Sequence, residues 1–145
     1  MTIELKYLNI LGYKEDVCII EEKKYEIIND IIKGICDKYE SKIINIIYVS
    51  AKQIQVLNKK YRKQTYKPTV LTFQYSDFAE IYICIEVIAQ EIGLNNNKDL
   101  SNEVMLYILY SITNCFDITK EIKEKLYFDI VDEYKDILDI NTTNL

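Results

Sequence analysis

The run IINIIYV at residues 43–49 constrains the fold most, because a helix-start signal follows it without a gap. A short run of mostly β-branched residues is typical of a buried strand. Ser50 and Gln53 then form the S-x-x-Q pattern of a capping box, in which each side chain bonds to the backbone N–H of the other residue. The pattern therefore predicts a strand that passes directly into a helix over residues 51–61. The helix residues expected to face inward are Ile54, Leu57 and Tyr61.

The periodicity of apolar residues predicts the other elements in the same way. Strands are expected over residues 2–10, 43–49, 70–73 and 81–85, and helices over residues 23–39, 51–61, 86–92, 99–115 and 120–138. This order indicates an α+β domain with a small mixed four-stranded sheet packed with about five helices. Helix 99–115 is expected to be central because its apolar residues fall on one stripe. The last helix is expected to turn inward Ile122, Leu126, Ile130, Tyr134 and Ile137.

Length and composition indicate one cytoplasmic domain. The 145 residues predict a single domain over residues 1–139 and a frayed tail over residues 140–145. No apolar run approaches the roughly 20 residues that cross a bilayer, and the first residues do not look like a signal peptide, so no membrane partner is expected. The cysteines form no C-x-x-C pair and are expected to be buried free thiols. They are Cys18, Cys36, Cys84 and Cys115.

The positive charges of this acidic chain are concentrated in one segment. With 18 basic and 23 acidic residues the net charge is −5, so any nucleic-acid binding must come from a local patch. Residues 41–76 contain no acidic residue and seven basic ones. Four of these lie at the end of the helix 51–61, where they suit the helix dipole and need no further role. The seven are Lys42, Lys52, Lys59, Lys60, Arg62, Lys63 and Lys67.

Arg62 is the only arginine in the chain, and every other basic residue is a lysine. A guanidinium binds phosphate or carboxylate with two parallel hydrogen bonds, a geometry that lysine does not reproduce. The single Arg in a Lys-rich chain therefore indicates a task that needs this geometry. One alternative is structural, with Arg62 paired to a carboxylate such as Glu86 or Glu103. Tyr61 and Tyr66, beside these charges, fit either base stacking or packing.

Histidine is absent from the whole chain. This excludes every mechanism in which an imidazole acts as a base, assists a nucleophile or binds a metal.

The segment LNKKYRKQTYKPTVLTF, residues 57–73, resembles the signature of the YbeY family of bacterial ribosomal-RNA maturation endoribonucleases, roughly LNxxYRxxDKPTDVLSF. The K-P-T triplet stands one position late, and Thr69 and Thr72 replace the family's aspartate and serine. A second family segment, GDIVIS, corresponds to residues 79–84, with Glu80 in place of the aspartate. The similarity covers about residues 43–137. The matching signature residues are Leu57, Asn58, Tyr61, Arg62, Val70, Leu71 and Phe73.

The resemblance implies a YbeY-like, metalloprotease-like fold and a zinc ion held by three histidines spaced H-x3-H-x5-H. The three positions hold Tyr110, Asn114 and Lys120 in this chain. A neutral tyrosine or amide is a poor zinc ligand and a charged lysine repels the ion, so the zinc cofactor is expected to be lost and no metal to bind. Cys115 and Asp117 lie near enough in sequence to be considered for a rebuilt site, but Cys115 falls on the apolar stripe. The three former ligand side chains are still expected to lie close together and to face a groove.

Three functions remain open from the sequence. The first is a protein of ribosome biogenesis that binds ribosomal RNA or a ribosomal protein without zinc-dependent cleavage. The second is an active endoribonuclease, specific for single strands, with a non-standard metal site or metal-free cleavage assisted by Lys120 or Tyr110. The third is a protein-interaction module on the same scaffold. The resemblance places Arg62 at an RNA-facing cleft, where it is also the one candidate catalytic residue. The predicted RNA-binding residues are Arg62, Lys59, Lys60, Lys63 and Lys67.

Overall fold

A computed structural model describes residues 3–7, 20–93 and 97–142 of the chain. The predicted passage from strand to helix at Ser50 is confirmed. The Ser50 Oγ accepts a hydrogen bond from the Gln53 N–H at 3.1 Å, and the Gln53 Oε1 accepts one from the Ser50 N–H at 2.8 Å. This capping box satisfies two backbone donors at the helix start, so the helix begins directly at Ala51.

The elements follow the predicted βαβαββααα order. The strands are β1 (Ile3–Tyr7), β2 (Ile43–Tyr48), β3 (Val70–Gln74) and β4 (Phe78–Ile83). The helices are α1 (Glu22–Lys38), α2 (Ala51–Arg62), α3 (Ile85–Ile92), α4 (Asn97–Thr113) and α5 (Lys120–Tyr134). The strands form one mixed sheet in the order β1-β2-β4-β3, in which β1, β2 and β4 are parallel and β3 is antiparallel to β4. The predicted α+β class with five helices and a mixed sheet is therefore confirmed.

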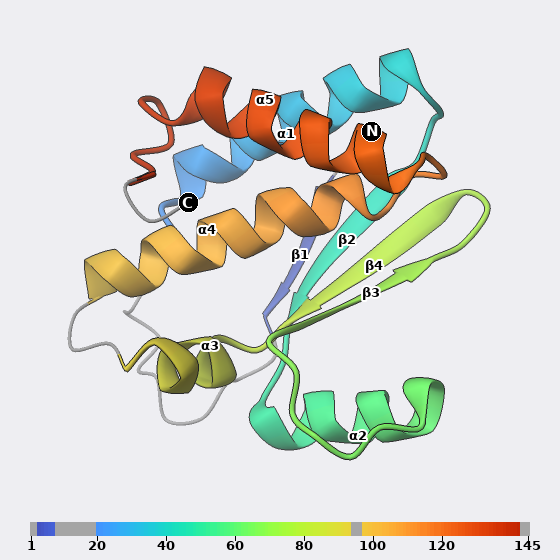
Figure 1. The fold of residues 1–145 in the computed structure, drawn as a ribbon, viewed down its shortest axis with the longest axis vertical. Helices are drawn as coiled ribbons and strands as arrows, with labels where there is room; N and C mark the ends of the chain where they lie inside the picture. The colour runs from blue at the N-terminus through green and yellow to red at the C-terminus, as the bar shows by residue number, and fades with distance from the viewer. Residues whose placement is uncertain (1–2, 8–19, 94–96, 143–145) are drawn as a thin grey trace.

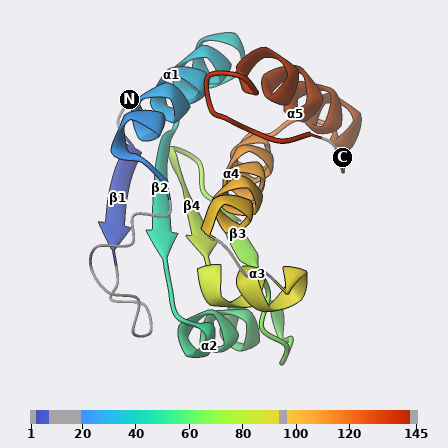
Figure 2. The ribbon, with the colours of Figure 1, turned by 90° about the vertical axis from the view of Figure 1, so that its left-hand side faces the viewer.

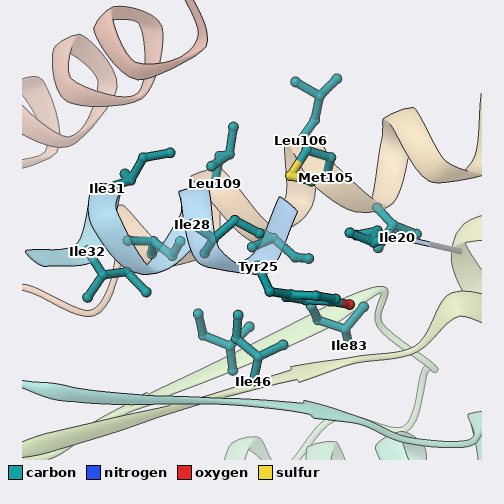
Figure 3. Packing of buried hydrophobic residues seen from close by; sticks show 14 of the residues in the cluster. Ile20, Tyr25, Ile28, Ile31, Ile32, Ile46, Ile83, Met105, Leu106 and Leu109 are labelled. Atoms are coloured by element: carbon teal, nitrogen blue, oxygen red, sulfur yellow. The ribbon is translucent and has the colours of Figure 1, made fainter. Parts of the chain in front are cut away.

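The two faces of the sheet are covered unequally. Helices α1, α4 and α5 lie on one face, and α2 lies on the other (Figures 1 and 2). The larger core joins α1 and α4 to the sheet, as Figure 3 shows for Tyr25 and Ile28 of α1, Leu109 of α4, and Ile46 and Ile83 of the strands. A smaller cluster, with Ile54 and Leu71 at its centre, lies under α2. The face of the sheet that carries α2 is thus covered by fewer helices and a smaller core, and we call it the thinner side.

Helix α4 is central, as predicted. Most of its apolar residues are buried, and it contacts α3, α5, β3 and β4. Helix α4 lies across the β3–β4 part of the sheet (Figure 1). This packing places the C-terminal end of α4 near the hairpin between the two strands. The buried apolar residues of α4 are Leu100, Val104, Met105, Leu106, Ile108, Leu109 and Ile112.

Several expectations about boundaries and burial were wrong. Strand β4 covers residues 78–83 rather than 81–85, because the short turn after β3 lets pairing with β3 begin at once. Helix α5 ends at Tyr134, before the predicted residue 138. Three side chains expected to face inward are exposed, since they lie near the ends of α2 and α5 or beyond them, away from the buried core. They are Tyr61 (55% exposed), Ile122 (39%) and Ile137 (61%).

The start of the C-terminal tail and two of the cysteines are buried. Within the tail expected to fray, Ile140 is buried and the Asn141 N–H donates to the Asn102 Oδ1 at 2.6 Å, while residues 143–145 lie outside the described residues. Cys84 and Cys115 are buried free thiols as predicted, and Cys36 is half-buried. Cys18 lies outside the described residues. Among the described residues, no helix has the length and apolar character needed to cross a membrane.

Candidate functional site

Helix α4, the loop after it and the start of α5 carry the three positions at which the resemblance implies zinc ligands. Tyr110 is 41% exposed on the last turns of α4, and its ring meets the edge of the Tyr127 ring at 5.3 Å between centroids. Asn114 follows the helix and is half-buried. The Lys120 side chain is 86% exposed and pairs loosely with Glu124 at 4.0 Å. Within the described residues no hydrogen bond or ion pair joins the three side chains, so their expected closeness stays a prediction.

The side chains around this frame do not fit a zinc ion. The described part of the chain contains no group of three or more Cys, Asp or Glu residues placed to hold a metal. Burial raises the pKa of the Cys115 thiol to about 12, and the thiol donates to the Ser111 carbonyl at 3.3 Å. The Cys115 side chain is thus fully buried and bonded to its own helix, and is not an open ligand for a metal. Asp117 is exposed, and with the neighbouring Glu40 it does not belong to any group of three such ligands in the described part of the chain.

A buried lysine lies directly behind this loop. The Lys42 side chain is 1% exposed, and its Nζ donates to the Cys115 carbonyl at 2.8 Å. The Glu40 Oε1 lies 3.5 Å from the same Nζ and also accepts from the Asp117 N–H at 3.1 Å. The ammonium thus satisfies a carbonyl just past the C-terminus of α4, where helix carbonyls lack partners and the dipole favours a cation.

Gln74, at the end of β3, joins the same network. In the amide orientation that satisfies both of its polar atoms, its oxygen accepts from the Lys42 Nζ at 3.1 Å and its nitrogen donates to the Asn114 carbonyl at 3.3 Å. Lys42, Glu40 and Gln74 therefore tie residues 114–117 to the start of β2 and the tip of the β3–β4 hairpin. This role could not be predicted from the sequence, because no motif distinguishes a buried lysine from the other six basic residues of the segment 41–76.

All five predicted RNA-binding residues are exposed at or just beyond the end of α2. Lys63 adopts the left-handed conformation (φ 59°) and ends the helix, and the Lys60 Nζ lies 5.2 Å from the centre of the Tyr61 ring. Arg62 forms no ion pair with any described residue, including Glu86 and Glu103, the two carboxylates considered as structural partners. Its guanidinium is therefore available to an external anion.

Asn58 positions the turn that follows these cations. It is fully buried, and its Nδ2 donates to the Tyr66 carbonyl at 3.0 Å, while the Gln55 Nε2 donates to the Thr65 carbonyl at 3.0 Å. These two bonds hold residues 63–67 against α2. Asn58 lies four residues after the buried Ile54, so a polar residue on the inward face of a predicted helix was the available signal for this role.

The two candidate regions lie on opposite faces of the sheet. Arg62 and its neighbouring lysines belong to α2 on the thinner side, whereas positions 110, 114 and 120 belong to α4, its loop and α5 on the other side (Figures 1 and 2). Strand β3 contacts both α2 and α4 and separates them. The two groups of residues therefore belong to elements on different sides of the sheet.

Comparison with known proteins decides the family. A family model described as "Endoribonuclease YbeY" matches residues 10–130. The chain belongs to this family. A YbeY endoribonuclease of Thermosipho melanesiensis is 29% identical over 125 residues, covering 79% of this chain and 86% of the relative. Another, from Thermotoga maritima, is 26% identical over 121 residues, covering 81% and 77% of the two chains.

A solved structure supports the fold. The solution structure of a Thermotoga maritima protein matches 99% of both chains with a TM-score of 0.51 and 22% sequence identity. At that identity the match supports the fold alone. The YbeY resemblance of residues 57–73 is confirmed by the family match, whereas the roles of individual residues remain predictions.

Proposed function

We propose that this YbeY-family chain binds ribosomal RNA, or a ribosomal protein partner, during the maturation of ribosomal RNA, and that it does so in the cytoplasm without zinc-dependent hydrolysis. The observation that carries the proposal is the exposed cation cluster at the end of α2, with an arginine that has no ion-pair partner among the described residues. The relatives named endoribonuclease support a role on RNA.

Physical reasons support an RNA phosphate as the ligand of Arg62. When exposed cations bind a nucleic-acid backbone, they displace the counterions condensed on its phosphates. This release favours binding in spite of the net charge of −5. The guanidinium adds two directed hydrogen bonds to a phosphate. Asn58 and Gln55 hold the turn that presents Lys63 and Lys67, so the cations are partly ordered before binding.

The side chains available to bind a metal or to act as a base support the proposed loss of zinc-dependent hydrolysis. A zinc-bound water would need ligands that the described residues do not assemble, and the chain has no histidine to act as a base. Cys115 is protonated and buried, and Lys42 is occupied by three acceptors. None of these groups is placed to remove a proton from an attacking hydroxyl.

The test is the substitution Arg62→Lys, measured by fluorescence anisotropy with a labelled single-stranded RNA. The change keeps the charge and removes the planar fork, so binding is expected to weaken by about 1–2 kcal/mol, or roughly five- to thirtyfold. Lys63→Gln serves as the matched control, since it removes one charge and is expected to weaken binding only mildly.

Thermal unfolding of the same variants separates binding from stability. Arg62 is exposed and has no ion pair with a described residue, so Arg62→Lys is expected to leave Tm unchanged. A lower Tm with an unchanged RNA affinity would contradict the proposal and would favour a protein-interaction module.

A further inference from the structure

The face of the sheet beside α2 carries a strip of aromatic rings. Strand residues alternate between faces, and Phe73 and Tyr82 pack with the cluster under α2. Tyr75 and Phe78 continue the same face toward the hairpin tip, where their rings stack with centroids 4.4 Å apart. The Phe73 ring lies 5.7 Å from that of Tyr82 and 5.2 Å from that of Tyr61 on α2. We call these five residues the aromatic strip.

Helix α2 does not cover the aromatic strip completely. Tyr61 is 55% exposed and Tyr75 is 43% exposed, and the other three rings are half-buried. A groove of about 400 Å³ continues the strip along α2, with Val56, Leu57 and Tyr82 in its lining and Lys52 at its side. In a monomeric protein, an open apolar surface of this kind beside charged residues marks a binding site.

The charges around the strip indicate how a ligand would lie. The cations gather at the end of α2 beside Tyr61, and the single carboxylate within β3 and β4 is Glu80, which pairs with Phe73 and lies between Phe78 and Tyr82 along β4. The Tyr82 hydroxyl donates to the Glu80 Oε2 at 3.1 Å. Burial and the Glu80 charge raise the pKa of Tyr82 to about 12, so this hydroxyl remains a donor. An anionic phosphate is repelled from Glu80, whereas an uncharged base can lie on the rings.

We propose that the aromatic strip binds unpaired bases of single-stranded RNA while the phosphates follow the cations at the end of α2. Aromatic rings beside a positive groove are the usual means of holding single strands, because every base has a face that can stack. The inference rests on the proposed RNA-binding function and adds the surface that holds the bases. It places them on the thinner side of the sheet, opposite α4 and positions 110, 114 and 120.

The experiment compares the variants Tyr61→Leu and Tyr75→Leu with the unchanged protein. The probes are a fluorescein-labelled RNA of about ten nucleotides without secondary structure and the same strand annealed to its complement. Each substitution is expected to weaken single-strand binding by about tenfold, since one stacked base is lost, and to leave the salt dependence unchanged, since no cation is removed. The duplex, whose bases are already stacked, is expected to bind more weakly to the unchanged protein.

Phe128→Leu is the matched control, since Phe128 is 57% exposed on α5, away from α2. It is expected to bind RNA normally.

Equal affinity for duplex and single strand, or normal binding by both tyrosine variants, would overturn the inference. If Arg62→Lys still weakened binding, the proposed function would stand without the aromatic strip. No binding of either RNA by the unchanged protein would overturn both. Binding of an acidic peptide at the strip with no RNA binding would identify the surface as a protein-docking site instead.

Discussion

At the scale of single residues, Lys42 is the least expected feature of the molecule. Lysine is rarely buried unless it is paired, and here the side chain is 1% exposed. Its Nζ has a carbonyl, a carboxylate and an amide oxygen as acceptors. The carbonyl lies in the loop after α4 and the amide at the end of β3, whereas Glu40 lies beside Lys42 in the loop between α1 and β2, so one ammonium group joins three segments that are far apart in the sequence.

Replacing Lys42 with Met is expected to destabilise the protein by about 2–4 kcal/mol, because the Cys115 carbonyl loses its donor and Glu40 loses its partner. Half-exposed Glu40 regains water, which keeps the loss toward the lower end. The measurement is thermal unfolding, with Tm lowered by roughly 5–15 °C. Lys125→Met removes an exposed ion pair with Asp129 and is expected to leave Tm unchanged. An unaltered Tm in Lys42→Met would show that the network does not stabilise the fold.

At the scale of elements, the loop between α4 and α5 is held in place by side chains from distant parts of the chain. Its backbone is well held, since Glu40 accepts from the Asp117 N–H and Gln74 donates to the Asn114 carbonyl. The Thr119 Oγ also accepts from the Ile122 N–H at 3.3 Å and fixes the start of α5. The spacing of positions 110, 114 and 120 is therefore kept by bonds that do not depend on a metal.

The combined substitutions Tyr110→His, Asn114→His and Lys120→His are expected to create affinity for zinc. Two histidines four residues apart, one near the end of α4 and one just past it, and a third at the start of α5 give the H-x3-H-x5-H spacing that the family resemblance implies. Elemental analysis after dialysis is expected to find one zinc ion per molecule. The control keeps Lys120 and changes only the other two residues, and it is expected to lose zinc on dialysis. If the triple variant retained no zinc, the backbone geometry would have drifted along with the ligands.

At the scale of the whole molecule, the sequence predicted the order of elements well and the covering of surfaces poorly. The capping box at Ser50 and the central α4 follow from local patterns, and both are present. Apolar periodicity cannot tell whether another element covers a given stripe, so Tyr61, Ile122 and Ile137 were expected inside and are exposed. The buried Lys42 network and the opposite placement of α2 and α4 depend on contacts between distant segments, and no local pattern encodes them.

The distribution of charge over the whole molecule leads to the last prediction. The chain is acidic overall, yet five exposed cations lie at or beyond the end of α2, so RNA affinity is expected to fall steeply with salt despite the net charge of −5. If three to five phosphates are neutralised, the logarithm of the binding constant falls with the logarithm of salt concentration with a slope of about −2 to −3.5, since each contact on a single strand contributes about −0.7. Lys59→Gln is expected to make this slope shallower by about 0.7, whereas Lys33→Gln, an exposed lysine on α1 across the sheet, is expected to leave it unchanged. A binding series measured from low to physiological salt gives all three slopes. Equal effects of the two substitutions would mean that RNA responds to the net charge rather than to the cations of α2, and the surface assigned to RNA would then be wrong.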